Sequence, residues 1–223
     1  MSIQIIGRSS SLFTRMPLIF AEELAVPFEL VPIYDMTAQD PEVYSGNPAL
    51  KLPILRADGC VLFGAQNICR AVAERARTPA LIVWPEQLSD DLSRNAQELV
   101  WHCMAAQVQL VLGMWINKLP ASNAYFKKTL AGLEGSLRWL DTHLADALEA
   151  IPRPRDVSLF EVSLFCLVEH LMFRPTVPVE PYPSLTAFAA DYGTRPSARS
   201  TAYRFDAPAD ASRNDHSDFH RAD

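Results

Sequence analysis

Four cysteines, at Cys60, Cys69, Cys103 and Cys166, are the most reactive side chains of this sequence. No two of them form a C-x-x-C pair, and no histidine cluster stands at the spacing of metal ligands. This pattern excludes zinc ribbons and dithiol redox sites of the C-x-x-C type, and we expect no bound metal. Isolated cysteines within apolar stretches are typical of buried thiols in a reducing compartment.

Three consecutive serines, Ser9 to Ser11, precede an apolar-periodic stretch that runs from Phe13 to Leu24. A serine in front of such a stretch is a helix N-cap signal. Pro17 lies inside the stretch, which predicts a helix that begins late or is kinked at this proline. Ser11 is therefore placed at the junction between a loop and a helix.

A second notable stretch runs from Asn47 to Leu55 and carries Pro53 at the opening of a predicted strand. Proline cannot donate a hydrogen bond to a strand ladder, so its place needs an explanation. A cis Leu52–Pro53 bond would turn the chain sharply and leave the Leu52 backbone groups free. A trans proline on an edge strand is the commoner alternative.

The segment from Ser158 to Glu161 has the form of a capping box. The Ser158 hydroxyl can accept from the Glu161 N–H, and the Glu161 carboxylate can reach back to the Ser158 N–H. Val157 and Val162 stand at the two positions of a hydrophobic staple. This motif predicts a helix start and indicates a folding role for Glu161.

Hydrophobic periodicity predicts two regions of different character. The first is mixed, with strands at 3–6, 28–33, 51–56 and 60–63 and helices at 13–24 and 65–76. The second is helical, with helices at 88–115, 124–148, 158–173 and 184–192. Because composition changes at Thr78–Pro79, we predict a first domain at 1–78, a linker at 79–85, a second domain at 86–208 and a disordered polar tail at 209–223.

Composition narrows the functional classes. The chain has 223 residues, of which 49% are hydrophobic, and its 26 acidic against 20 basic residues disfavour a nucleic-acid partner. Its 8 glycines against 17 prolines favour helix over an all-β sandwich. We find no basic segment ahead of an apolar run at the N-terminus and no stretch of about 18 apolar residues, and therefore expect a soluble, cytoplasmic protein without a membrane partner.

These motifs together resemble the cytosolic glutathione transferase family, from Ile3 to Ala207. Asn47 to Leu55 is similar to the family's N-P-x-x-K-V-P-x-L, with Leu52 in place of valine. Four other segments resemble family motifs in the same order along the chain: 11–15, at the first helix; 22–28, at that helix's exit; 158–161, the capping box; and 182–185 with 195–197, near the C-terminus. The resemblance implies an α/β thioredoxin-like N-terminal domain followed by an all-α C-terminal domain.

The resemblance also implies glutathione as co-substrate and assigns roles to residues. Ser11 would stabilise the glutathione thiolate, because a hydroxyl donor at a helix N-terminus favours the anion; the alternative is that Ser11 only caps the helix. The first strand lacks a tyrosine and no cysteine precedes Cys60, which favours the serine type. Leu52, next to Pro53, would orient the cysteinyl part through its backbone. Lys51 would attract a ligand carboxylate or remain a solvated lysine.

One motif departs from the family. Where the family has an acidic residue or glutamine followed by serine, this chain has Gly64–Ala65. The Ala65 N–H can still bind the γ-glutamyl carboxylate, and Gln66 can compensate without charge. Losing charge-assisted hydrogen bonds of about 1.5–3 kcal/mol each would weaken glutathione binding about tenfold or more. A non-catalytic binding or interaction module, or a cleft for a different ligand, are therefore the alternatives to a transferase.

The family's second-substrate pocket would be supplied here by Phe13, Trp101 and Met104, whose side chains suit an apolar electrophile. The same residues could be plain core. The resemblance further implies a homodimer and a small-molecule electrophile as partner.

Overall fold

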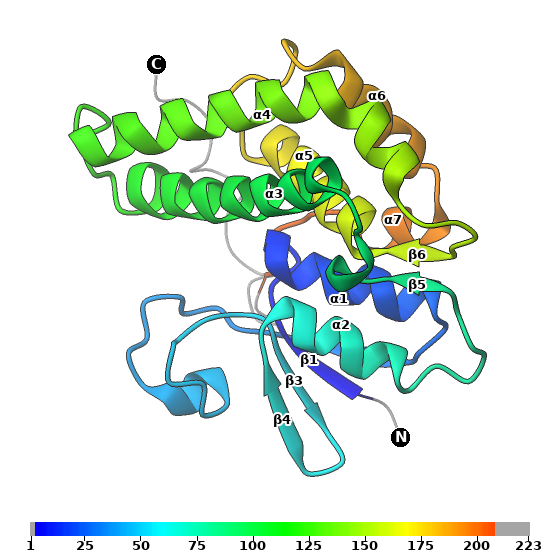
Figure 1. Ribbon diagram of the computed structural model, residues 1–223. Helices are drawn as coiled ribbons and strands as arrows, with labels where there is room; N and C mark the ends of the chain where they lie inside the picture. Colours follow the sequence, from blue (N-terminus) through cyan, green and yellow to red (C-terminus); the bar gives the residue numbers. More distant parts are fainter. Residues whose placement is uncertain (1–2, 208–223) are drawn as a thin grey trace.

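Residues 3–73 form a four-stranded mixed sheet with two helices in the structure, a computed structural model that describes residues 3–207 (Figure 1). The central strand β1 (Ile3–Gly7) pairs in parallel with β2 (Phe28–Pro32) and antiparallel with β3 (Ile54–Ala57). A hairpin joins β3 to β4 (Cys60–Phe63), so the strand order is β2-β1-β3-β4. Its turn was predicted at 58–59, where both residues have positive φ.

The helix α1 (Leu12–Glu23) connects the two parallel strands, and α2 (Ala65–Ala73) follows β4. The two helices pack against each other and lie between the sheet and the second region of the chain (Figure 1). Of the two alternatives predicted for Pro17, the late start is wrong, because α1 starts at Leu12 and continues through the buried Pro17. The strand predicted from residue 51 begins only at Ile54.

The second region is helical, as predicted. It contains α3 (Asp91–Leu110), α4 (Ala124–Ala150), α5 (Leu159–Phe173), α6 (Pro183–Tyr192) and the short α7 (Pro196–Ser200), which was not predicted. The helix α5 is apolar nearly all round and almost wholly buried, because it packs against α1, α3 and α6 at once. The sequence-based boundaries of the two domains remain predictions, and the predicted tail at 209–223 lies outside the described residues.

Short elements occupy the connections. In the predicted linker, β5 (Ile82–Val83) pairs in parallel with β6 (Val157–Ser158), just ahead of α5. Single-turn 3-10 helices stand at η1 (Pro41–Tyr44) and η2 (Pro85–Gln87), and α3 continues into a π-helical segment, η3 (Val111–Ile116).

The capping box at the start of α5 forms only in part. The Ser158 hydroxyl accepts from the Glu161 N–H at 3.4 Å, as expected. The Glu161 carboxylate does not reach back to Ser158. It accepts two hydrogen bonds from the Arg155 guanidinium instead, at 2.8 and 2.9 Å, because a fork of two charged donors outcompetes one backbone N–H.

Arginines fasten α1 to the helical region. The Arg15 side chain is 1% exposed, donates to the Ala198 carbonyl at 2.9 Å and lies between the rings of Phe165 and Tyr203. At the other end of the helix, Arg195 donates both arms of its guanidinium to Glu23 at 2.7 Å. The helix α1 is therefore joined to α5 and the C-terminal segment by ring contacts and a hydrogen bond at Arg15 and by an ion pair at Arg195.

By length and hydropathy alone, the run Asp91–Ile116 is long and apolar enough to cross a membrane, which differs from the sequence-based expectation. Its buried residues pack against α4 and α5. Only 33% of the apolar window is buried, so the core accounts for part of the apolar character of this run.

Candidate functional site

A cavity of about 870 Å³ lies between the first domain and the helical region. Its walls come from the loop between β1 and α1, the segment before β3, the start of α2, and α3 with η3 and the end of α5. Eight of the nine predicted site residues line this one cavity: Ser11, Phe13, Lys51, Leu52, Pro53, Ala65, Gln66 and Trp101.

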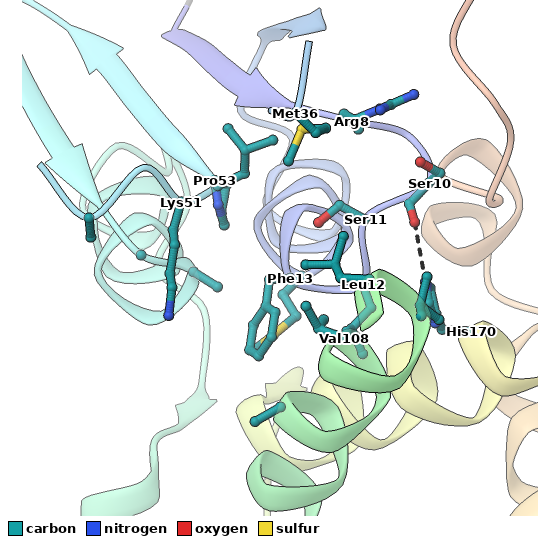
Figure 2. Close-up of a pocket in the computed structure, with 18 of the residues that line it drawn as sticks. Arg8, Ser10, Ser11, Leu12, Phe13, Met36, Lys51, Pro53, Val108 and His170 are labelled. Carbon is teal, nitrogen blue, oxygen red and sulfur yellow. Dashed lines mark hydrogen bonds between the residues drawn. The ribbon is translucent and has the colours of Figure 1, made fainter. Parts of the chain in front are cut away.

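Ser11 is the N-cap of α1, and its hydroxyl oxygen accepts a hydrogen bond from the Thr14 N–H at 3.2 Å. This bond occupies the oxygen and leaves the hydroxyl proton available as a donor. Figure 2 shows the Ser11 hydroxyl pointing toward the side of the cavity that carries Lys51 and Pro53. Capping and donation to a ligand are therefore compatible at the same residue.

The two neighbouring serines make different contacts. The Ser9 hydroxyl donates to the Asp206 carboxylate at 2.6 Å, and the Ser9 N–H donates to the same carboxylate at 2.8 Å. Ser10 lines the cavity, and its carbonyl accepts from the His170 ring nitrogen at 3.2 Å (Figure 2). The Ser9 hydroxyl is therefore engaged with Asp206, whereas Ser10 and Ser11 both line the cavity.

The segment before β3 presents backbone groups. The Leu52–Pro53 bond is cis, the first of the two sequence-based alternatives. The buried Asn47 side chain holds this loop, since it donates to the Lys51 carbonyl at 2.8 Å and accepts from the Ala49 N–H at 3.0 Å. Within residues 3–207 the Leu52 N–H and C=O have no hydrogen-bond partner, so both can pair with a ligand.

The N-terminus of α2 opens into the cavity at Gly64, Ala65 and Gln66. Gly64 is the N-cap and has φ +88°, a conformation that side-chain-bearing residues rarely adopt, and it makes no side-chain cap. The first N–H groups of the helix are therefore open to an anion. The Asn67 amide is already used, because it donates to the Phe63 carbonyl at 3.1 Å.

The helical wall is apolar and uses one face of α3. Trp101 and Val108 line the cavity from this face, and Figure 2 shows Val108 near Phe13 of α1. Met104, predicted to line the pocket, does not: it is completely buried in the core. It lies on the helix face shared with Val100 and Cys103, which points away from the cavity.

Sequence reasoning missed the polar groups at one end of the cavity, which are Arg8, His170 and Arg174. His170 is 3% exposed, and its two ring nitrogens face the Ser10 carbonyl and the Gln107 amide, both at 3.2 Å. Burial, with the nearby Arg174 charge, lowers the pKa of His170 to about 4. The ring is therefore neutral at pH 7 and links α5 to the serine loop.

None of the four cysteines lines this cavity. Burial raises the pKa of the Cys103 and Cys166 thiols to about 12, so neither forms a thiolate at neutral pH. Cys60 is exposed on β4. In the part of the chain that the structure describes, no group of three or more histidine, cysteine, aspartate or glutamate side chains could hold a metal ion.

Comparisons with known proteins agree with this architecture. Residues 10–75 match the family model of the glutathione S-transferase N-terminal domain. No curated protein matches the sequence. The chain is similar to a glutathione S-transferase from Methylobacillus flagellatus KT solved with glutathione bound, at a TM-score of 0.71 and 22% identity, over 91% of this chain and 100% of the other.

Two further solved structures have the same fold. A glutathione S-transferase from Methylobacterium radiotolerans in complex with glutathione sulfonate has a TM-score of 0.72 at 19% identity, over 94% of this chain and 99% of the other. A glutathione transferase family member from Pseudomonas fluorescens Pf-5 with bound S-(propanoic acid)-glutathione has a TM-score of 0.68 at 19% identity, over 91% and 100%. The chain has the glutathione transferase fold, a thioredoxin-like domain followed by an all-helical domain.

Proposed function

We propose that this chain is a serine-type glutathione transferase, which transfers the glutathione thiolate to a small electrophile. One observation carries the proposal: the Ser11 hydroxyl, the unpaired Leu52 backbone groups and the N-terminus of α2 all face a single cavity. The match of residues 10–75 to the N-terminal-domain model and the glutathione ligands of the similar structures support it.

In this proposal glutathione extends along the first domain. Its γ-glutamyl carboxylate meets the N–H groups at the start of α2, with Gln66 beside them, and its cysteinyl backbone pairs with Leu52. Lys51 is exposed at the cavity rim and attracts a carboxylate of the tripeptide. The thiol then lies near Ser11, at the N-terminus of α1.

The chemistry follows from this placement. The thiol loses its proton to solvent, and the thiolate is stabilised by the Ser11 O–H and by the partial positive charge of the α1 N-terminus. The sulfur forms a bond to an electrophilic carbon of the second substrate, and a leaving group departs with its electron pair. Phe13, Trp101 and Val108 hold the apolar body of that substrate.

Glutathione binding tests the proposal directly. Isothermal titration is expected to show one site per chain, and the ultraviolet absorbance of the thiolate is expected to appear in the complex at neutral pH. In Ser11→Ala the binding persists while the thiolate signal is lost. Absence of binding at millimolar glutathione would overturn the proposal.

A second function is favoured by one observation, the Gly64–Ala65 departure. Gly64 has no side chain and the structure gives α2 no side-chain cap, so no charged group from these two positions meets the γ-glutamyl amine. The fold would then serve as a non-catalytic binding module. Binding of glutathione without any thiolate signal in the wild-type protein would favour this function.

The assembly and compartment belong to the same proposal. We expect a homodimer in the cytoplasm, as is usual for the family that the sequence resembles. Light scattering on the purified protein checks the assembly, and a mass of one chain would contradict it.

A further inference from the structure

Among residues 3–207, two arginines of the cavity have no anionic partner. Arg8 follows β1 and Arg174 follows α5, so they come from different domains and line the same cavity. Within residues 3–207 neither forms a salt bridge, and neither side chain donates a hydrogen bond. The Arg8 Nε is completely buried and, within residues 3–207, has no hydrogen-bond partner. A buried unpaired donor costs free energy unless an acceptor pairs with it.

Arg8 and Arg174 line the same cavity, and the charge of Arg8 affects Arg174. Burial, followed by the charge of Arg8, lowers the pKa of Arg174. Arg174 is also packed against the ring of Phe205, 4.8 Å from its centroid, which restricts the guanidinium. Two half-buried cations that share a cavity repel each other, and each loses part of its hydration. An anion between them offsets both the repulsion and the lost hydration.

Two carboxylates of the C-terminal half, Asp206 and Glu169, are hydrogen-bonded or paired with groups other than Arg8 and Arg174. Asp206 accepts both the N–H and the hydroxyl of Ser9, and Glu169 is paired with the buried Arg15 at 3.8 Å. His170 presents no charge, because it is neutral and both its ring nitrogens are hydrogen-bonded. Within residues 3–207, neither arginine therefore has a salt-bridge partner, although the Asp206 carboxylate, which binds only neutral donors of Ser9, keeps its charge.

We infer that Arg8 and Arg174 form a subsite for the anionic group of the second substrate, which is an electrophile with an apolar body and a carboxylate. The planar forks of two arginines match a carboxylate in shape as well as in charge. The apolar body extends along Phe13, Val108 and Leu112, which line the same cavity.

The position of Arg8 separates this subsite from the one proposed for glutathione. Figure 2 shows Lys51 and Pro53 on one side of Ser11, and Arg8, Ser10 and His170 on the other. Ser11 thus lies between the two subsites, where a thiolate and an electrophilic carbon would meet. The assignment of the anion to the electrophile rests on the proposed function, whereas the anion subsite itself does not.

The experiment uses two matched aromatic probes, para-nitrobenzoate and nitrobenzene, titrated into the full chain without glutathione. Wild-type protein is expected to bind the benzoate at least tenfold more tightly than nitrobenzene. Arg8→Gln and Arg174→Gln are each expected to weaken the benzoate about tenfold or more, because each removes charge-assisted hydrogen bonds. The affinity for nitrobenzene should change less than about twofold in the same variants, because this probe has no carboxylate to lose hydrogen bonds. Unchanged nitrobenzene affinity also shows that the cavity is intact. The exposed Arg77, outside the cavity, provides the control Arg77→Gln, with both affinities unchanged.

Three results would overturn the inference: equal affinity for the two probes, equal loss of both probes in the arginine variants, or loss of benzoate binding when glutathione is saturating. The third would assign the arginines to glutathione itself. A protein that binds the benzoate through its arginines but never binds glutathione keeps the anion subsite and rejects the transferase function. A protein that binds glutathione but binds para-nitrobenzoate and nitrobenzene with equal affinity would keep the transferase function and reject the anion subsite.

Discussion

The two ends of the cavity are built from different chemical groups. At the end that we assign to glutathione, the donors and acceptors are mostly backbone groups, from Leu52 and the start of α2. At the other end they are side chains, Arg8 and Arg174, contributed by both domains. A backbone-built subsite survives changes of residue type, whereas a subsite built from charged side chains fails when one side chain is replaced. Substitutions should therefore separate the two ends.

The largest effect is expected where the ends meet, at Ser11. In Ser11→Ala, conjugation of glutathione with chlorodinitrobenzene should fall about 100- to 1,000-fold in kcat, as for loss of one donor to a developing anion. Affinity for para-nitrobenzoate should not change, because the arginine end is intact.

The control for this rate is Ser9→Ala, because the wild-type Ser9 hydroxyl is engaged with Asp206. That variant should retain most of the wild-type rate. A loss in Ser9→Ala that matches the loss in Ser11→Ala would show that the geometry of the whole serine loop, and not the Ser11 hydroxyl, carries the effect.

The difference between the ends also explains what the sequence could predict. The fold followed from local signals, such as the Asp58–Gly59 turn and the serine ahead of α1, which act over a few residues. Ser11 could be named from its helix N-cap signal together with the family resemblance, whereas Leu52 and Ala65 could be named only through that resemblance. The departure at Gly64 was also visible, but not its positive φ, which belongs to the folded loop.

The arginine end could not be predicted, because Arg8 and Arg174 are far apart in the sequence and meet only when α5 packs against α1. An arginine is normally a solvated surface residue, and what marks these two is their place in one cavity without a salt bridge within residues 3–207, with the Arg8 Nε buried and unpaired. Met104 was misplaced for a related reason. Helical periodicity shows which residues share a face, but not which face meets the cavity and which meets the core.

The second prediction concerns the stability of the protein at low pH, which depends on the buried His170 at the arginine end. The native pKa of His170 is about 4, below its ordinary value of 6.5. Above pH 6.5 neither state of the protein binds this proton, so stability is unaffected. As the pH falls from 6.5 toward 4, the unfolded chain takes up a proton that the native state refuses. The free energy of unfolding should then drop by roughly 3 kcal/mol from this group.

Chemical denaturation at pH 7 and near pH 4 measures this drop, with His170→Gln as the matched variant. Glutamine keeps an N–H donor for the Ser10 carbonyl but does not titrate, so the variant should lose less stability between the two pH values than the wild type. An identical loss in both proteins would show that His170 does not supply the pH dependence.

The third prediction concerns Gly64, which stands at the glutathione end where an acidic side chain is lacking. Gly64 has φ +88° and ψ 142°, and a Cβ built there meets open space, so the obstacle is backbone conformation and not crowding. Gly64→Ala should therefore lower the free energy of unfolding by about 1–3 kcal/mol. Urea denaturation checks this, with Gly132→Ala, in the middle of α4, as the control that should not destabilise. Equal effects at the two positions would remove the conformational explanation.

The smallest effect is expected from restoring one donor at the glutathione end. Ala65→Ser places a hydroxyl at the first position of α2, beside the N–H groups that we assign to the γ-glutamyl carboxylate. One added hydrogen bond of about 0.5–1.5 kcal/mol should tighten glutathione binding about two- to tenfold. The affinity for para-nitrobenzoate should stay the same, since Arg8 and Arg174 are untouched. Isothermal titration of glutathione and of para-nitrobenzoate into the variant and the wild type measures both affinities. If Ala65→Ser instead strengthened the benzoate and left glutathione unchanged, the two ends of the cavity would have been assigned the wrong way round.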